Sequence, residues 1–151
     1  MCIRDRWEEV NVTTKEQLNG ANFGWRPREG LIETPKKKVG GPIPEGALDP
    51  VKVYYHGTED DEGLSINGGY VYRGSVKSLQ GQYLYSDYVN PRIWSFEFKD
   101  GTATNHQDLT KTLGRPDGEN FSQLASFGQD ADKEIYLIEM GAGAIWKIIE
   151  E

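Results

Sequence analysis

The feature that most constrains the fold of this chain is a pattern that occurs twice. QYLYSDYVNPRIWSFEF contains the pair Ile93-Trp94, and EIYLIEMGAGAIWKIIE contains the pair Ile145-Trp146, 52 positions later. In both segments an apolar stretch and a turn precede the Ile-Trp pair, which opens a second apolar stretch. A period of about 50 residues with several short strands per unit is typical of β-propeller blades. Because a blade buries its faces only against neighbouring blades, we expect an all-β chain that is part of a larger propeller.

Short stretches rich in β-branched and aromatic residues are separated by Gly, Asn, Asp and Pro along most of the chain, and we predict them as strands. They are residues 8–12, 22–26, 51–55, 66–73, 82–86, 92–98, 110–113, 122–127, 134–139 and 144–149. Only residues 14–18 have a helical pattern. Residues 33–50 contain four prolines and no alternation, and this indicates a long loop.

Two adjacent glycines, Gly68 and Gly69, stand at the start of the alternating run YVYRG. A glycine in a strand allows another backbone, or a ligand, to approach where a Cβ atom would clash. We therefore expect a close approach at this position, as at the crowded inner ends of blade strands. The alternative is an ordinary glycine pair in a β-bulge.

The composition restricts the classes of function. The chain has 151 residues, which suffices for one domain. Its net charge of −7 argues against nucleic-acid binding. No apolar run approaches the ~18 residues of a membrane span, and no signal-peptide pattern opens the chain. We interpret residues 1–6, MCIRDR, as an adapter-derived segment and assign residues 7–151 to the propeller blades, which sets aside the single cysteine, Cys2.

Six motifs follow one another along the chain. They are WEEVNV (7–12), NFGWRPREG (22–30), YYHG (54–57), SINGGYVYRG (65–74), YLYSDYVNPRIW (83–94) and SFGQDADKEIYLI (126–138). In this order they resemble the C-terminal blades of the glucose/sorbosone dehydrogenase family, six-bladed propellers that share their domain with hedgehog-interacting proteins. The resemblance implies a partial six-bladed β-propeller, with about two to three blades of antiparallel four-stranded sheet in this chain.

The resemblance also implies a function. The characterised enzymes of the family are secreted or periplasmic quinoproteins that hold pyrroloquinoline quinone (PQQ) above a calcium ion and oxidise the anomeric hydroxyl of aldoses. It therefore implies a fragment of a PQQ-dependent sugar dehydrogenase that is periplasmic or secreted, with a small sugar or glycan as ligand and a cytochrome as electron acceptor. The alternative is a non-catalytic extracellular propeller that binds a protein or glycan partner, as hedgehog-interacting proteins do.

The family's catalytic histidine lies in an earlier blade, so no catalytic residue is assigned here. The two histidines of this chain, His56 and His106, are not substitutes for it. His56, in YYHG beside four acidic residues, could approach the ligand-binding face of a propeller. We interpret it instead as a histidine of a surface loop.

A calcium site is implied by the resemblance. Calcium prefers carboxylate and carbonyl oxygen ligands. The family uses a glutamate in the segment that matches WEEVN and a backbone carbonyl in the segment that matches NFGW, which places the ligands at Glu9 and Phe23. The alternative for Glu9 is a solvent-exposed strand residue.

A quinone site is the second implication. The three PQQ carboxylates require cationic partners, but the positions where the quinoproteins place a lysine and two arginines carry other residues here. They are Ser86, Asp87 and Tyr88, and Ser122 and Gln123. Arg73 and Arg92 lie close by in sequence and could substitute, or could be residues of the blade surface. The predicted cofactor-binding set is Arg73, Asp87, Tyr88 and Arg92.

Two acidic segments and the apolar face residues complete the predictions. EDDE (59–62) lacks the spacing of a calcium loop and is interpreted as a solvated loop. In GQDAD (128–132), Asp130 and Asp132 are predicted to cap a turn.

In a chain without its neighbouring blades we expect exposed apolar side chains and aggregation. These side chains include Trp94, Phe96, Trp146 and Ile148.

Overall fold

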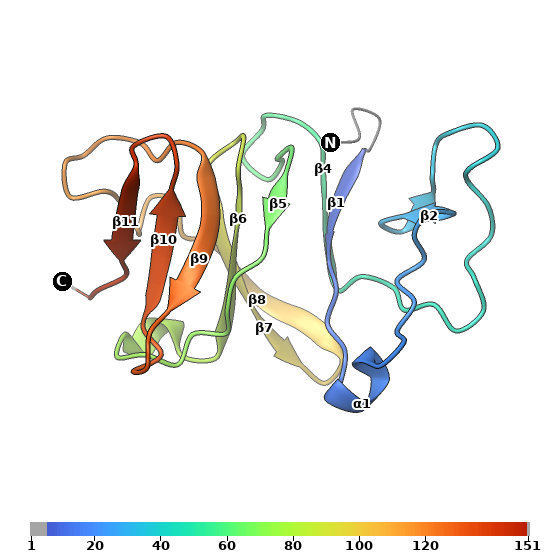
Figure 1. The fold of residues 1–151 in the computed structure, drawn as a ribbon, viewed down its shortest axis with the longest axis horizontal. Coiled ribbons are helices and arrows are strands. Elements are labelled where there is room, and N and C mark those ends of the chain that lie inside the picture. The colour runs from blue at the N-terminus through green and yellow to red at the C-terminus, as the bar shows by residue number, and fades with distance from the viewer. Residues whose placement is uncertain (1–5, 151) are drawn as a thin grey trace. The chain divides into compact units, whose positions relative to one another are not determined.

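The computed structural model describes residues 6–150, so most of the segment 1–6 lies outside the described residues. The chain divides into two compact units, Met1–Glu62 and Gly63–Glu151. The regular secondary structure of the described residues is nearly all β, with one short α-helix, α1 (Lys15–Leu18), and one 3₁₀ turn, η1 (Lys77–Leu79) (Figure 1). No helix among residues 6–150 has the length and apolar composition that a membrane span requires.

The first unit contains two small antiparallel sheets. One pairs β1 (Trp7–Val10) with β4 (Lys52–Tyr55), and the other pairs β2 (Arg28–Glu29) with β3 (Ile32–Glu33). These findings confirm strands in 8–12 and 51–55, and the helix in 14–18 is confirmed by α1, which Thr14 caps.

The predicted strand at 22–26 is wrong, because this segment forms only an isolated bridge between Asn22 and Ala47 and then turns. The side-chain oxygen of Asn22 accepts a hydrogen bond from the Gly24 amide at 2.9 Å. Such local side-chain to backbone bonds favour turns over strands. The predicted loop is confirmed from residue 34 onward; β3 takes up its first residue.

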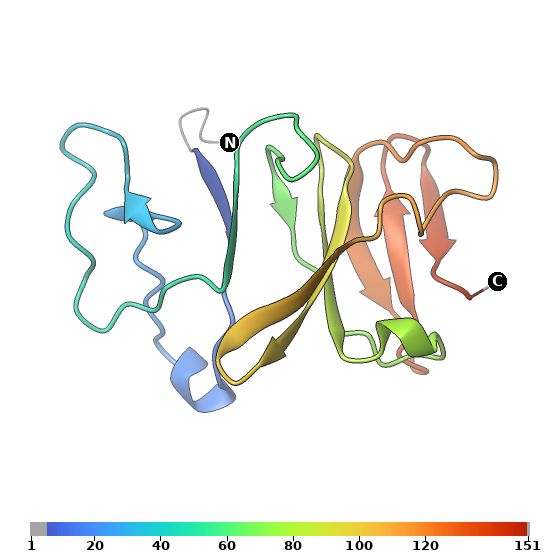
Figure 2. The ribbon, with the colours of Figure 1, turned by 180° about the vertical axis from the view of Figure 1, so that it is seen from behind.

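The second unit begins with a four-stranded sheet in the order β5-β6-β7-β8. Its strands are β5 (Ile66–Asn67), β6 (Gln82–Asp87), β7 (Ile93–Lys99) and β8 (Thr102–Asp108). Strands are confirmed in 82–86 and 92–98, whereas 66–73 is a strand only at its start, followed by a bridge between Val71 and Tyr83. Figure 2 shows the long hairpin of β7 and β8 from behind.

The fourth strand of this sheet differs from the prediction. Residues 110–113 form a turn, and the strand is instead β8, whose sequence TATNHQD has no apolar alternation. The hairpin turn before it places Asp100 and Gly101 at φ +52° and +82°. Two successive positive φ angles match the two-residue turn that an Asp-Gly pair favours, so the turn chemistry accounts for this strand.

The second sheet of this unit has three strands in the order β11-β10-β9. They are β9 (Leu124–Gln129), β10 (Ile135–Glu139) and β11 (Ala144–Lys147), which confirms the strands predicted in 122–127, 134–139 and 144–149. The turn between β9 and β10 is capped as predicted by Asp130, whose carboxylate accepts a hydrogen bond from the Glu134 amide at 2.9 Å.

A hydrophobic core lies between the two sheets of the second unit. The four-stranded sheet contributes Leu84 and Ile93, and the three-stranded sheet contributes Phe127, Leu137 and Ile148. The predicted exposure of the face residues is therefore wrong. Ile148 is buried in the core between the two sheets, and Trp146 is half-buried against that core. Trp94 and Phe96 are also buried, but on the opposite face of the first sheet, where both pack against Tyr85.

The close approach predicted at Gly68 and Gly69 is confirmed. A Cβ atom added at Gly69 would lie 2.3 Å from the carbonyl oxygen of Leu84 in β6 and 3.1 Å from the ring of Phe127 in β9. At Gly68 it would lie 3.1 Å from the Tyr83 hydroxyl. Gly69 therefore lets the chain pass against the β6 backbone where a side chain would clash.

Candidate functional site

A cleft of about 490 Å³ lies in the second unit, between the loop that joins β6 to β7 and the segment that joins β8 to β9. Most of its lining residues are polar or charged. These residues are Asn90, Arg92, Thr110, Lys111, Arg115, Glu119 and Asn120, and Pro91 and Phe121 add apolar surface. The cleft contains one of the predicted cofactor residues, Arg92, together with two cations that sequence reasoning missed, Lys111 and Arg115.

Asp87 fixes the β6–β7 side of this cleft. Its carboxylate is fully buried, and Oδ1 accepts hydrogen bonds from the amides of Val89 at 2.9 Å and Asn90 at 2.8 Å. Oδ2 accepts from the amides of Leu64 at 2.7 Å and Ser65 at 2.6 Å. Four backbone donors therefore surround the carboxylate, and Asp87 organises the loop that carries Asn90 and Arg92.

Arg92 and Asp108 connect the two sides of the cleft. An Arg92 guanidinium nitrogen lies 3.9 Å from an Asp108 carboxylate oxygen, and the Arg92 side chain is 18% exposed. The other Asp108 oxygen accepts a hydrogen bond from the Thr110 amide at 2.8 Å. The Thr110 hydroxyl in turn accepts one from the Ile93 amide at 3.0 Å. These contacts hold the start of the 109–121 segment against β7.

Arg115 and Glu139 fix the opposite side. Arg115 forms hydrogen bonds with both carboxylate oxygens of Asp117, and these bonds raise the pKa of Arg115 and lower that of Asp117. The guanidinium also donates to Glu139 at 3.3 Å and lies 5.2 Å from the ring centroid of Trp146. Glu139, 1% exposed, further accepts hydrogen bonds from the Ser122 amide and the Trp146 indole, each at 2.7 Å.

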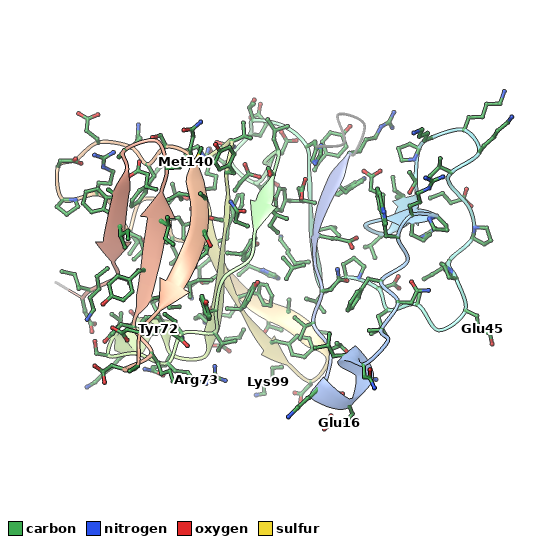
Figure 3. The ribbon with its side chains drawn as sticks, in the orientation of Figure 1. Glu16, Glu45, Tyr72, Arg73, Lys99 and Met140 are labelled. Atoms are coloured by element: carbon green, nitrogen blue, oxygen red, sulfur yellow. The ribbon has the colours of Figure 1, made fainter. Side chains whose placement is uncertain are left out.

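The structure does not bring the predicted cofactor residues into one site. Arg73 is exposed and donates to the Val71 carbonyl at 3.4 Å. The adjacent Tyr72 exchanges backbone hydrogen bonds with Gln82 and Gly81 at the start of β6, whereas Asp87 and Arg92 lie at the end of that strand. Figure 3 shows Arg73 and Met140, in the turn after β10, at opposite ends of this unit. A shared site of Arg73 with Arg92 is therefore excluded in this structure.

Tyr88 lies beside the cleft, and its amide donates to the Ser65 carbonyl at 2.8 Å.

The sequence did not indicate Lys111, Arg115 and Glu139, because they belong to no local motif. Arg115 and Glu139 are 24 positions apart and meet only because the 109–121 segment folds back onto β10.

The predicted calcium ligand Glu9 lies in the first unit on β1 and is half-buried. Its carboxylate accepts hydrogen bonds from the Asn11 side chain and the Gly30 amide, both at 3.0 Å. Two buried oxygens in this unit, Asn11 Oδ1 and Glu29 Oε2, have no hydrogen-bond partner. Such oxygens suit a hard cation, but across residues 6–150 no group of three or more His, Cys, Asp or Glu side chains is arranged to hold a metal.

His56 has a more specific environment than the predicted surface loop. Its Nε2 lies 2.7 Å from the Glu8 carboxylate, and the two side chains are 17% and 20% exposed. The pair therefore joins β1 to the residue that follows β4. His106 lies on β8, and its ring centroid is 5.7 Å from that of Phe96.

The chain is similar to known proteins in sequence and in fold. No family model matches the chain. The HIPL1 protein of Arabidopsis thaliana is 32% identical over 161 residues, which covers 91% of this chain and 23% of that protein. The HIPL2 protein of the same plant is 27% identical over 167 residues, covering 97% of this chain and 23% of that protein. This chain therefore spans less than a quarter of the length of these relatives.

Two solved structures share the fold. A glucose dehydrogenase aligns with a TM-score of 0.59 and 13% identity, covering 98% of this chain and 38% of that one. A second glucose dehydrogenase structure aligns with the same TM-score and identity over 96% of this chain and 39% of that one. The similarities confirm the resemblance predicted from the six motifs, and the fold is that of part of a β-propeller.

Proposed function

We propose, from the confirmed resemblance of this chain to the glucose/sorbosone dehydrogenase family, that it is part of a sugar dehydrogenase that oxidises a sugar hydroxyl with PQQ. The chain would supply one side of the ligand-binding face through the cleft between residues 90–92 and 110–121. Because the chain spans 23% of its curated relatives, this activity is proposed for the longer protein.

The observation that carries the proposal is the composition of the cleft. Asn90 and Asn120 line the cleft and carry side-chain amides, which can donate to and accept from sugar hydroxyls. The Thr110 hydroxyl is instead engaged with the Ile93 backbone. Convergent polar groups fix the orientation of a ligand in a preformed cleft, and the polar lining of this cleft suits a ligand with many hydroxyl groups. The volume of about 490 Å³ falls in the usual range for small-molecule sites.

Arg92 and Lys111 are the cleft residues that would meet the PQQ carboxylates, because cationic side chains are the natural partners of carboxylates. Arg115 is instead engaged with Asp117 and Glu139, so its role is to position the loop. PQQ, when bound, would supply the redox chemistry for the oxidation. The residues of this chain bind, orient and hold charge around the cleft, and the proton acceptor belongs to another part of the protein.

The test uses the complete protein loaded with PQQ and calcium. We expect aldose-dependent reduction of a redox dye, and Arg92→Leu should lower it at least about tenfold, as loss of a charge-assisted contact does. Arg73→Leu is the matched control, because it removes the same charge at the far end of the sheet and should leave the rate unchanged. Equal rates for the parent and Arg92→Leu would contradict the assignment.

A second candidate is a non-catalytic propeller that binds a protein or glycan. The observation that favours it is the buried Asp87 carboxylate, which occupies a position where the quinoproteins carry cationic residues and which is engaged by four backbone amides. A complete protein that binds glycans but neither binds PQQ nor reduces the dye would establish this candidate.

Location and partners follow from the same resemblance. We propose a secreted or periplasmic protein with a cytochrome as electron acceptor, and a structural calcium ion at Glu9 and the Phe23 carbonyl. The calcium proposal is supported by the unpartnered oxygens of Asn11 and Glu29 in the same unit.

A further inference from the structure

Cationic residues gather in one segment of the first unit, although the chain as a whole is acidic. Residues 24–44 contain five of the 17 Lys and Arg residues and two of the 24 Asp and Glu residues. One of these two acids, Glu29, is buried and accepts hydrogen bonds from the amides of Arg6 and Trp7. The other, Glu33, is exposed. The surface of this segment therefore carries an excess of positive charge within a chain of net charge −7.

Three consecutive lysines in this segment lie on a loop whose two ends are fastened to the same carbonyl group. The Pro27 carbonyl accepts hydrogen bonds from the amide of Thr34 at 3.0 Å and from that of Gly41 at 3.2 Å. The Thr34 hydroxyl donates to the carbonyl of Arg26 at 2.7 Å. These bonds close the loop at its base and place that base beside the backbone of Arg26.

The lysines occupy the turn between these two ends. The Lys36 carbonyl accepts a hydrogen bond from the Val39 amide at 2.9 Å, so Lys37 and Lys38 are the central residues of the turn. The three lysines and Arg26 are all exposed. In the part of the chain that the structure describes, none of these four side chains has an ion pair or hydrogen-bond partner. Their charges are therefore available to a ligand.

Lys133, in the turn between β9 and β10, provides a comparison within the same molecule. Lys38 and Lys133 have the same left-handed backbone conformation, with φ angles of +66° and +68°, and both are exposed. Lys133 lies between Asp132 and Glu134, whereas Lys38 follows two other lysines. The backbone conformation alone therefore indicates no site, and the concentration of positive charge distinguishes the turn at 36–38.

This arrangement suits an extended anion better than a small one. The cationic groups follow one another along an exposed turn, and a polymer with many charges can contact several of them at the same time. Lysine clusters are typical of patches that bind nucleic acids or heparin-like glycans. Nucleic-acid binding usually takes a basic face of a whole domain, but here the positive charge is confined to one segment.

Two apolar residues favour a glycan over a lipid surface. Trp25, which is 58% exposed, directly precedes Arg26. An exposed indole offers a flat apolar surface that a sugar ring can cover beside the charged groups. Val39 in the lysine turn is half-buried, so the turn offers little apolar surface for insertion into a membrane.

We propose that Arg26 and the lysine turn at 36–38 bind a linear anionic polysaccharide through its sulfate or carboxylate groups. Each cationic side chain would meet an anionic group of the polymer, and Trp25 would cover one face of a neighbouring sugar ring. This site belongs to the first unit and uses no residue of the cleft in the second unit. The proposal is therefore independent of the proposed oxidation chemistry.

The first test measures binding by the complete protein. We expect it to bind heparin, which carries sulfates, or polygalacturonate, which carries only carboxylates, and the stronger of the two identifies the preferred anionic group. Neutral dextran should not bind, and the affinity should fall as salt rises, because salt screens exposed charges. The proposal is overturned if neither polymer binds at about 0.15 M salt. It is also overturned if only phosphatidylserine vesicles or single-stranded DNA bind.

The second test locates the site with matched variants of the complete protein. Replacing Lys36, Lys37 and Lys38 together by Gln should weaken binding at least about tenfold, and Lys38→Gly alone about two- to fivefold. Lys38→Gly should not lower the melting temperature, because glycine readily adopts a positive φ. Lys133→Gly is the control, since it removes the same charge from the same backbone conformation and should leave the affinity unchanged. Equal losses for the two glycine variants, or full affinity of the triple variant, would overturn the proposal.

Discussion

The two units of the chain are stabilised in different ways. Among residues 6–62, Val10 and Tyr54 are the buried hydrophobic side chains, whereas the second unit has a continuous core between two sheets. The first unit relies on carboxylates that accept backbone hydrogen bonds. Glu29 accepts from the amides of Arg6 and Trp7, and Glu9 from that of Gly30. An apolar core between two sheets therefore stabilises the second unit. Hydrogen bonds from backbone amides to carboxylates stabilise the loop-rich first unit.

The largest expected effect tests the core of the second unit. Phe127, 6% exposed, packs in the core between the sheets. Phe127→Ala should lower the free energy of unfolding by about 3–5 kcal/mol, because it removes buried apolar surface and leaves a cavity. Urea denaturation of the chain measures this. A loss below about 1 kcal/mol would mean that the two sheets do not stabilise each other.

The calcium prediction concerns the first unit. Saturating calcium should raise the melting temperature of the complete protein, since a ligand at about 100 times its Kd contributes about 2.7 kcal/mol. Glu9→Gln should remove most of this rise, because it keeps the side-chain shape and deletes the charge. Calorimetry with calcium and with chelator measures both proteins. Glu9 is not a ligand if both respond equally.

The polar contacts of the first unit can be tested at Glu29, which is 4% exposed. Glu29→Leu should lower the free energy of unfolding by about 1–3 kcal/mol, because the amides of Arg6 and Trp7 lose their acceptor. Glu33→Leu at the end of the same hairpin is the control, since Glu33 is exposed. Thermal unfolding of both variants measures the difference, and equal stability would show that apolar contacts dominate this unit as well.

The smallest effect is a pH dependence in the second unit. Hydrogen bonds from Ser75 and Tyr72 lower the pKa of Glu134 to about 2, and the Tyr72 hydroxyl donates to this carboxylate at 2.6 Å. A carboxylate whose pKa is lowered on folding stabilises the native state above its unfolded pKa of about 4.5. This stabilisation is lost as the pH falls from about 4.5 to about 2. Acid titration of the melting temperature should show a shallower slope for Glu134→Gln in that window.

The sequence predicted the fold where apolar alternation was strong. The Ile-Trp repeat located two hairpins, because their register places apolar residues on buried faces. Apolar alternation did not predict β8, since TATNHQD is polar and mostly exposed. Only the Asp100-Gly101 turn determines its pairing. The prediction of a strand at 22–26 is wrong for the opposite reason. The aromatic residues of this segment suggested a strand, but the hydrogen bond from the Gly24 amide to the Asn22 side chain favours a turn.

The candidate site was less predictable than the fold. Arg92 was identified because it lies inside a motif, but its partner Asp108 comes from the strand that sequence analysis missed. Arg73 was included on sequence proximity alone, and the antiparallel arrangement carries it to the far end of the sheet. Lys111 and Arg115 reach the cleft through a loop whose path depends on the buried Glu139. Long-range contacts of this kind leave no local pattern.

The buried Asp87 carboxylate affects which positions of this protein can accept amino-acid substitutions during evolution. It accepts hydrogen bonds from backbone amides of the segments at 64–65 and 89–90, which every amino acid except proline supplies. These four hydrogen bonds do not involve the side chains of Val89 and Asn90, so substitutions there leave the bonds to Asp87 in place. A mutational library at these two positions should retain folded proteins with altered ligand preference, whereas substitutions of Asp87 itself should be eliminated.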